Sequence, residues 1–322
     1  WRLYEGIRAA NEFLLSLKDV DLSRYEYDTN YENWVKQLNY FPYEARVLRA
    51  HYFFELARRY GDIAMPLAVL TTEEANAISK TPFEEVIGFI VSECKDCANN
   101  LPVTYTGQPN NETGRITKGF AMAVKSKALL YAASKLHNPS NSKDKWEVSA
   151  KAAYEIIHSG TYSLDPAEKA NNISSPEVVL IHMNGASAAF ERNNFPIRFT
   201  EGTRATPTSA TFPSQNLVDA FQTVNGYPVT LTDNGWECGD PAFNPQHPYA
   251  NRDPRFERTI LANGMKFKGS EIAVYKGGSD YTSISEGGSP TGYFLRRYIQ
   301  ETTHFEMDKE VVNKHHWIVY RY

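Results

Sequence analysis

PYEARVLRAHYFFELARRYG, residues 42–61, decides the fold, because its apolar residues recur at helical spacing on two faces. The first face is an apolar stripe made of Ala45, Leu48, Tyr52, Leu56 and Tyr60. The second face is a stripe made of Val47, Ala50, Phe54 and Ala57. A helix that rests on a surface needs only one such stripe. We therefore expect this helix to lie between two neighbours, at the centre of a helical array.

Two residues indicate where this helix ends. Gly61 suits the left-handed position just past a helix end, and Pro66 blocks any continuation. A separate short helix is expected before it, around residues 31–38. Arg46 and Arg49 are expected to anchor loops through buried charge pairs with carboxylates.

Further helices are predicted on both sides of the central one. Residues 1–18 carry a helical stripe, and Thr81-Pro82-Phe83-Glu84 has the pattern of a capping box at the start of the next helix. Thr117 is expected to cap a third helix. A fourth carries Trp146, Ala150, Ala153 and Ile157 on one side. The last two helices together have about the ~34-residue tetratricopeptide period, and a generic helical hairpin is the alternative.

The pattern of the sequence changes near residue 171, from helical stripes to a strand-like run and long loops. EVVLIHM, residues 177–183, is typical of a strand. The segment 184–213 is too long for an ordinary connection, so we expect a functional loop there. Asn263-Gly264 lies between two short apolar runs and predicts a hairpin turn. We therefore predict a helical region at residues 1–170 and a loop-rich region at residues 171–322.

Composition excludes several classes of partner. The chain has 322 residues, a net charge of −4 and no basic block, which argues against a nucleic-acid partner. No apolar run approaches the ~20 residues that a membrane-spanning helix needs. Both ends of the sequence are abrupt, so we expect a fragment that lacks both natural ends.

No recognisable catalytic pattern is present. The sequence lacks a nucleophile elbow, a zinc signature, a phosphate-binding glycine loop and an EF-hand loop, so we expect no enzyme, no metal and no cofactor. Cys94 and Cys97 fall inside a helical pattern and are expected to pack rather than to react. Residues 252–255, Arg-Asp-Pro-Arg, are interpreted as a charged turn that locks a loop to the helical body.

Loop aromatics remain as candidates for binding. A saccharide ring is held by an aromatic ring laid against its C–H face and by polar side chains aimed at its hydroxyls. Three groups have that composition: Trp236 with Asn234 and Asp233, Tyr281 beside Asp280, and Trp34 beside Asn33. For each, the alternative is an aromatic ring that packs on its own domain. Trp236 ranks first, and Trp34 second because a helical tryptophan is more often core.

Several stretches resemble, in order, the landmarks of the SusD/RagB family, the surface nutrient-binding lipoproteins of Bacteroidota-type outer membranes. They are WRLYEGIRAANEFL (1–14), EARVLRAHYFFELARRYGD (44–62), GRITKGFAMAVKSKALLYAAS (114–134), PSQNLVDAF (213–221), YANRDPRF (249–256), TGYFLRRY (291–298) and HWIVYRY (316–322). The last resembles the opening of the family's RYAEVLL helix.

The resemblance implies both a fold and a function. It implies a mainly α fold of tetratricopeptide-like helix pairs, an α-α superhelix, with long irregular loops and a minor β hairpin. The implied function is non-catalytic capture of a glycan at the outer surface, for delivery to a SusC-like TonB-dependent transporter. An N-terminal lipidated cysteine would supply the membrane anchor, the helices would dock the transporter and the loop aromatics would hold the sugar. A binder of peptide or another nutrient, a helical protein scaffold and, third, a glycoside hydrolase remain alternatives.

Overall fold

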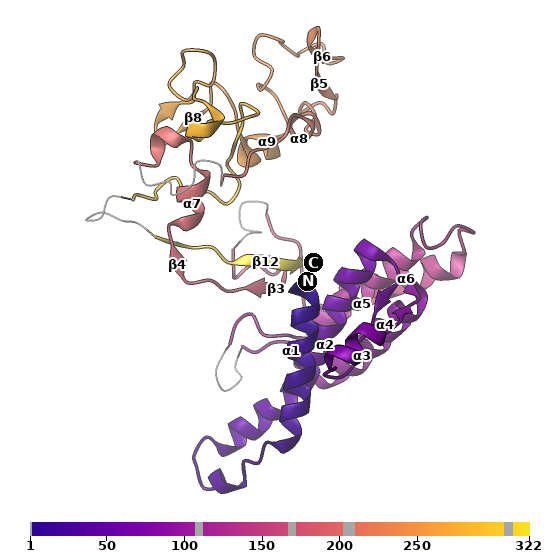
Figure 1. The fold of residues 1–322 in the computed structure, drawn as a ribbon. Coiled ribbons are helices and arrows are strands. Elements are labelled where there is room, and N and C mark those ends of the chain that lie inside the picture. Colours follow the sequence, from indigo (N-terminus) through magenta and orange to yellow (C-terminus); the bar gives the residue numbers. More distant parts are fainter. Residues whose placement is uncertain (1, 107–111, 167–171, 202–209, 306–311) are drawn as a thin grey trace. The chain divides into compact units, whose positions relative to one another are not determined.

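The computed structural model describes residues 2–106, 112–166, 172–201, 210–305 and 312–322 (Figure 1). Backbone contacts divide it into a helical unit, Trp1–Met183 with His316–Tyr322, and a loop-rich unit, Asn184–His315. From the sequence, this boundary was predicted at residue 170, with the second region extending to residue 322. The structure differs because the last strand pairs with the strand at 178–182 and so joins the helical unit.

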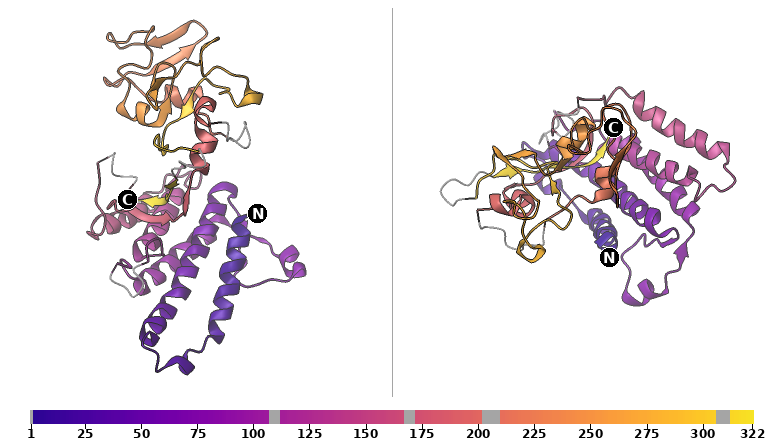
Figure 2. Two further views of the ribbon diagram at one scale, coloured as in Figure 1. Left: turned by 90° about the vertical axis from the view of Figure 1, so that its left-hand side faces the viewer. Right: turned by 90° about the horizontal axis from the view of Figure 1, so that it is seen from above.

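The helical unit is an array of antiparallel neighbours. Its elements are α1 (Arg2–Ser16), α2 (Tyr31–Tyr60), β1 (Ile63–Ala64), α3 (Thr72–Ala77), β2 (Lys80–Thr81), α4 (Phe83–Asn100), α5 (Lys118–Ala133), α6 (Lys143–Ile157), β3 (Val178–His182) and β12 (Trp317–Arg321). Consecutive long helices pack on one another, α1 on α2, α2 on α4, α4 on α5 and α5 on α6 (Figure 2). The expected mainly α fold is confirmed, whereas the tetratricopeptide assignment of the helix pairs stays a prediction.

Helix α2 is longer than the sequence indicated. It runs unbroken from Tyr31 to Tyr60, with Pro42 inside it, so the prediction of a separate short helix before Pro42 was wrong. Inside a helix, proline removes one backbone donor and its ring crowds the carbonyl four residues earlier, but α1 packs along α2 and supports it. The helix therefore continues through a residue that would end a less supported one.

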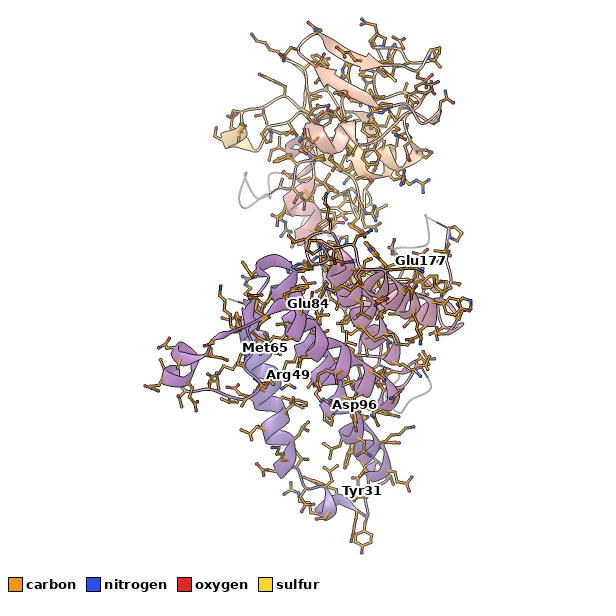
Figure 3. All side chains as sticks on the ribbon, turned by 90° about the vertical axis from the view of Figure 1, so that its right-hand side faces the viewer. Tyr31, Arg49, Met65, Glu84, Asp96 and Glu177 are labelled. Atoms are coloured by element: carbon orange, nitrogen blue, oxygen red, sulfur yellow. The ribbon has the colours of Figure 1, made fainter. Side chains whose placement is uncertain are left out.

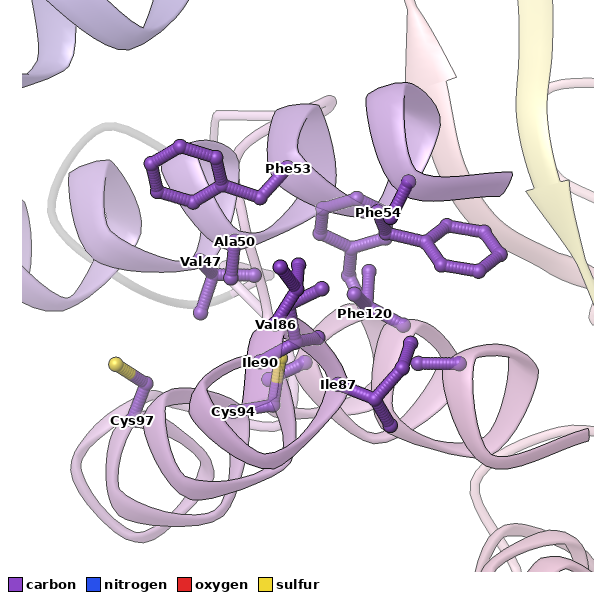
Figure 4. Close-up of a cluster of buried hydrophobic side chains, with 14 of the residues drawn as sticks. Val47, Ala50, Phe53, Phe54, Val86, Ile87, Ile90, Cys94, Cys97 and Phe120 are labelled. Carbon is purple, nitrogen blue, oxygen red and sulfur yellow. The ribbon is translucent and has the colours of Figure 1, made fainter. Parts of the chain in front are cut away.

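Burial on two sides of α2 is confirmed, but the first stripe is less buried than expected, because Leu48 and Tyr52 are only half-buried. The second stripe, Val47, Ala50, Phe54 and Ala57, is at most 1% exposed (Figure 4). Tyr60 of the first stripe is 70% exposed, contrary to expectation, because it lies at the last turn of the helix. Phe53, on neither predicted stripe, is fully buried, and its ring meets Phe89 of α4 edge to face.

The arginines of α2 form the charge pairs expected of them, but with carboxylates of a helix rather than of a loop. Arg46 and Arg49 both pair with Glu93 of α4, at 2.7 and 3.3 Å. Arg49 lies on α2 (Figure 3) and also donates to the side-chain oxygen of Asn11 on α1 and to the backbone carbonyl of Leu67. These bonds tie three helices and one loop together at the centre of the unit.

The predicted capping box at Thr81 is absent. The first N–H of α4, from Phe83, instead donates at 2.8 Å to Asp62, which lies far back in the chain. A complete capping box does occur at Thr71 and Glu74, where it begins α3 between β1 and β2. The local cap predicted at Thr81 is therefore replaced by a cap from Asp62, a residue distant in the sequence.

The cap of α5 agrees with the sequence prediction, whereas the apolar side of α6 is not buried. Thr117 caps α5 as expected, through a hydrogen bond from the backbone N–H three residues on. The apolar side of α6, including Trp146 and Ile157, is exposed, and the buried residues of α6 are Ser149 and Ala152. Small side chains let α6 approach α5 closely, so its large apolar residues point away from the array.

The last described segment of the chain is a strand. Trp317–Arg321 forms β12, which pairs antiparallel with β3, so the prediction that HWIVYRY opens a helix was wrong. Side chains alternate along it, and Tyr320 is buried against Phe120 of α5 while its two neighbours are exposed. Alternation with a period of two is the signature of a strand with one buried face. The predicted strand at 177–183 is confirmed as its partner.

The loop-rich unit consists of short elements held by two small apolar clusters. Its elements are β4 (Ala186–Ser187), α7 (Ala189–Asn194), α8 (Gln215–Asp219), β5 (Val229–Thr232), β6 (Gly235–Cys238), α9 (Pro254–Thr259), β7 (Ile260–Leu261), β8 (Lys266–Phe267), β9 (Ser270–Glu271), β10 (Phe294–Leu295) and β11 (Asn313–Lys314). The described strands pair in twos, β4 with β11, β5 with β6, β7 with β10 and β8 with β9.

The Asn263-Gly264 turn does not close a hairpin. The strands on its two sides belong to different sheets, since β7 pairs with β10 and β8 with β9. The N–H of Gly264 donates to the carbonyl of Ile272, and Asn263 accepts from the N–H of Val274. These hydrogen bonds hold the turn against residues 272–274, so the two strands beside it do not pair with each other.

Both cysteines of the C-x-x-C pattern are buried on α4 as free thiols. Burial raises the pKa of Cys94 well above its ordinary value and that of Cys97 to about 12. Neither thiol ionises near neutral pH, so the packing role predicted for them is confirmed. Among the described helices, none is both long and apolar enough to cross a bilayer.

Candidate functional site

The candidate residues fall in three separate places. Asp233, Asn234 and Trp236 lie together on the β5–β6 hairpin of the loop-rich unit. Tyr281 lies in another loop of that unit, and Asn33 and Trp34 lie in the first turn of α2 in the helical unit.

The β5–β6 hairpin holds Trp236 against its own unit. Asp233 and Asn234 form the exposed two-residue turn between Thr232 and Gly235, which face each other in the strand register. The indole of Trp236 is half-buried and meets Tyr249 edge to face, with 5.7 Å between ring centroids. The exposed polar turn remains open to a ligand, while the tryptophan packs on an apolar cluster.

The loop that carries Tyr281 is closed by Asp280. The backbone N–H of Asp280 donates to the carbonyl of Ala273, and its carboxylate accepts from the N–H of Ala273, both at 2.9 Å. Arg198 donates two further bonds to the same carboxylate, at 2.9 and 3.0 Å. Asp280 is almost fully buried. This carboxylate is therefore a structural anchor and is not available to a ligand.

Closure of this loop also depends on glycine. A Cβ atom placed on Gly278 would lie 2.4 Å from the carbonyl oxygen of Ala273, closer than atoms can approach. Gly277 has a positive φ of 88°, which side chains rarely tolerate. We define the anchored loop as residues 273–281; its shape is fixed by backbone bonds, a buried charge pair and two glycines.

Two tyrosines project from the anchored loop. Tyr275 and Tyr281 are 63% and 57% exposed. Both are one turn from Gly278, whose N–H donates to the carbonyl of Tyr275 and whose carbonyl accepts from the N–H of Tyr281. Tyr275 is not among the binding residues predicted from the sequence. The signal that could have found it is a second tyrosine before the Gly277-Gly278 pair that precedes Tyr281.

Such a loop suits the capture of a ring-shaped ligand. An exposed aromatic ring offers an apolar face with a polar tip. A backbone that is already ordered loses little further freedom when a ligand binds. The anchored loop therefore combines the chemistry that a sugar face requires with the rigidity that makes such contacts effective.

The third place is the connection between α1 and α2. Trp34 is 37% exposed and meets Tyr25 edge to face at 5.8 Å. Tyr27 is 93% exposed, and Asn33 is half-buried. The tryptophan is therefore no core residue of the helical array, and it lies in an exposed aromatic cluster.

A pocket of about 560 Å³ on the helical unit is less suited to a sugar. It lies between α1, α3 and the segment that joins β1 to α3, and its surface is mostly apolar. Its inner polar groups are already used: the amide of Asn11 donates to the carbonyls of Pro66 and Ala68, and the hydroxyl of Tyr4 donates to that of Ala64. The other polar side chains that line it, Glu5, Arg8 and Asn76, are exposed to solvent.

The Arg-Asp-Pro-Arg segment is structural, as predicted, but within the loop-rich unit. Arg252 is buried and donates to the backbone carbonyls of Val218 and Phe221. Asp253 caps α9 and accepts from Arg255, whose hydrogen bonds lower the pKa of that carboxyl group to about 2. The segment thus joins α8 to α9 rather than a loop to the helical body. Among the described residues, no three His, Cys, Asp or Glu side chains are arranged to hold a metal ion.

Comparison with known proteins identifies a protein family whose model matches the C-terminal part of the chain. Residues 176–322 match the model of the SusD family. No curated protein sequence matches the chain. The expected resemblance to the SusD/RagB family is therefore confirmed from the family model, over a stretch that includes the anchored loop and the β5–β6 hairpin.

Solved structures show the same fold over nearly the whole chain. A SusD-like carbohydrate-binding protein from Bacteroides fragilis NCTC 9343 aligns with a TM-score of 0.69 at 22% identity, covering 99% of this chain and 57% of that one. A second SusD-like protein from that organism gives 0.71 at 23%, covering 99% and 60%. A laminarin-binding SusD-like protein gives 0.55 at 21%, covering 99% and 62%. This chain spans less than two thirds of each of these proteins.

Proposed function

Because residues 176–322 match the model of the SusD family, we propose that this protein is a non-catalytic glycan-binding protein of the bacterial cell surface. The anchored loop and the β5–β6 hairpin both lie inside the matched residues. Two of the similar structures are named for carbohydrate binding and for laminarin binding. This supports a saccharide as the ligand class.

The observation that carries the proposal is the pair of exposed tyrosines on the anchored loop. Tyr275 and Tyr281 present their rings from a backbone that Asp280 and Arg198 fix in place. A sugar ring laid against either phenol ring loses water from its C–H face while its hydroxyls stay solvated. Binding then needs no movement of the protein.

The other candidate residues supply further contacts in this proposal. Asp233 and Asn234, exposed in the hairpin turn, can accept and donate hydrogen bonds to hydroxyl groups, with Trp236 beside them. Asn33 and Trp34 form a separate aromatic patch on the helical unit. Each of these remains a proposal that single substitutions test.

The helical unit is proposed to dock a SusC-like TonB-dependent transporter in the outer membrane. The exposed apolar side of α6, with Trp146 and Ile157, supports a protein partner there, because apolar side chains of this size seldom gather on a free surface. An N-terminal lipid anchor would hold the protein at the cell surface. Pull-down of the transporter by the full chain, lost on Trp146→Asp with Ile157→Asp and kept with Leu136→Asp, tests this docking.

Glycan capture is tested by screening the chain on a glycan array and titrating the best ligand by calorimetry. We expect saturable binding and no release of reducing ends from the same glycan. Hydrolysis that disappears when one carboxylate is replaced would contradict the non-catalytic assignment. Binding to peptides with no binding to any glycan would favour a SusD-like peptide binder instead.

A further inference from the structure

A second, differently charged pocket lies on the helical unit. It has a volume of about 290 Å³ and is formed by α4, α5 and α6. Three lysines line it, Lys95, Lys118 and Lys125, together with one carboxylate, Glu155. The volume is at the small end of the ~300–1,000 Å³ typical of small-molecule sites. The pocket therefore suits a single small group.

The positive charge of this pocket is only partly neutralised. Glu155 is used by Lys125, at 2.5 Å, and Lys125 is 16% exposed. Neither Lys95 nor Lys118 has a carboxylate within ion-pair distance in the described parts of the chain. The hydrogen bond from Lys125, and then the charges of Lys125, Lys151 and Lys95, lower the pKa of Glu155. One carboxylate is thus surrounded by an excess of ammonium groups.

The pocket also has a fixed apolar wall. Cys94, 1% exposed, and Ala98, both on α4, contribute to it, and Met122 of α5 closes it from the other side. Burial raises the pKa of Cys94, so the thiol adds no negative charge near neutral pH. Ammonium groups at the edge of a dry wall attract an anion more strongly than they do in open water.

We propose that this pocket binds a tetrahedral oxyanion, a sulfate or phosphate group, through Lys95 and Lys118 with support from Lys125. Lysine is a compact point charge with three donors, which suits a tetrahedral group, whereas a planar carboxylate is better matched by the fork of an arginine. No arginine lines the pocket in the described residues. The group can arrive as a free inorganic anion or as an ester on a sugar.

The test titrates the full chain with sodium sulfate, at constant ionic strength maintained with sodium chloride. Binding is followed by calorimetry, and the amide signals of α4 and α5 are followed by nuclear magnetic resonance. We expect saturable binding that weakens at least tenfold in Lys95→Ala with Lys118→Ala. The control is Lys143→Ala on α6, because Lys143 is 87% exposed, pairs with Glu147 and does not line the pocket. Melting of each variant checks that it is folded.

Further arms identify the source of the group. Inorganic phosphate, glucose 6-sulfate and glucose are titrated in the same way. A sulfated sugar that binds more tightly than free sulfate, while glucose does not bind, supports an ester ligand, and equal binding of the free anion supports an inorganic one. Non-saturable binding, or equal loss in Lys143→Ala, identifies an adventitious ion only and overturns the proposal. Glycan binding at the anchored loop is measured separately and does not depend on this result.

Discussion

The two units of this protein are stabilised in different ways. The helical unit has one large apolar cluster, built from stripes on α2, α4 and α5. The loop-rich unit has two small clusters and also depends on buried polar residues that bond to other side chains or to the backbone. These are Asp280 with Arg198, Asp240 with Thr223, Glu191 with His315, and Arg252 with backbone carbonyls.

This difference explains where binding residues can occur. In the helical unit, the rings of Phe53, Phe54 and Phe120 form the apolar core, and Trp34 and Tyr60, at the two ends of α2, are exposed. In the loop-rich unit, polar anchors fix the backbone, so that aromatic rings on the loops need not be buried to hold the structure. Exposed tyrosines on the anchored loop are the result, and we propose that a ligand covers them.

The largest effect is expected from the core of the helical unit. Phe54 is fully buried between α2 and its neighbours, whereas Leu48 is half-buried. Phe54→Ala should lower the free energy of unfolding by roughly 3–5 kcal/mol, and Leu48→Ala by about half of that or less. Thermal and urea unfolding measure both. Equal losses in the two variants would show that the two stripes of α2 are buried alike.

The next largest loss of stability is expected when the buried carboxylate of the anchored loop is removed. Asp280→Ala removes a buried carboxylate that accepts from Arg198 and Ala273, and we expect a loss of about 3 kcal/mol, because one partner is left unpaired. Hydrogen exchange should increase within residues 273–281. Glu286→Ala, which removes an exposed carboxylate of a nearby loop, is the control. If both variants behave alike, Asp280 is no anchor.

A pH effect is expected from the helical unit. His51 of α2 is surrounded by Tyr52, Phe120 and Tyr320, and its burial lowers its pKa to about 4. Above the ordinary histidine pKa the two states bind the same number of protons. As the pH falls from about 6.5 to about 4, only the unfolded state takes up the proton, so the folded state loses up to about 3 kcal/mol.

Unfolding experiments across this pH window test the assignment to His51. His51→Gln should remove part of the decrease in stability on acidification, and His247→Gln, at an exposed position, should not. Other groups titrate in the same window, so the difference between the two variants is the relevant quantity. Identical pH profiles would assign the acid sensitivity to carboxylates alone.

Much of the helical unit could be predicted from the sequence. Two-sided burial of α2, its arginine pairs and the cap of α5 follow from periodicity and from local rules. The errors arose where tertiary contacts replaced local ones: Asp62 took the place of a Thr81 cap, and pairing with β3 turned the segment at 317–321 into a strand. Helix α6 was misjudged because its small residues, not its large ones, face α5.

The candidate site was less predictable. Composition drew attention to Trp236, yet no local rule says that its ring meets Tyr249. Tyr281 was found beside Asp280, but the anchoring role of Asp280 depends on Arg198, which lies far away in the sequence. Tyr275 became apparent only once the loop was known to be closed. Burial and long-range polar bonds, which the sequence does not show, decide which loop aromatics are free.

Calorimetric titration of Tyr275→Ala with Tyr281→Ala against the preferred glycan tests the central claim most directly. Each lost ring should cost about 1 kcal/mol of binding, so affinity should fall by about thirtyfold in total. The melting temperature should barely change, because both rings are exposed. Tyr60→Ala, an exposed tyrosine on α2, should leave affinity unchanged. Full affinity in the double variant, with binding lost on Trp236→Ala at an unchanged melting temperature, would contradict the account and move the site to the β5–β6 hairpin.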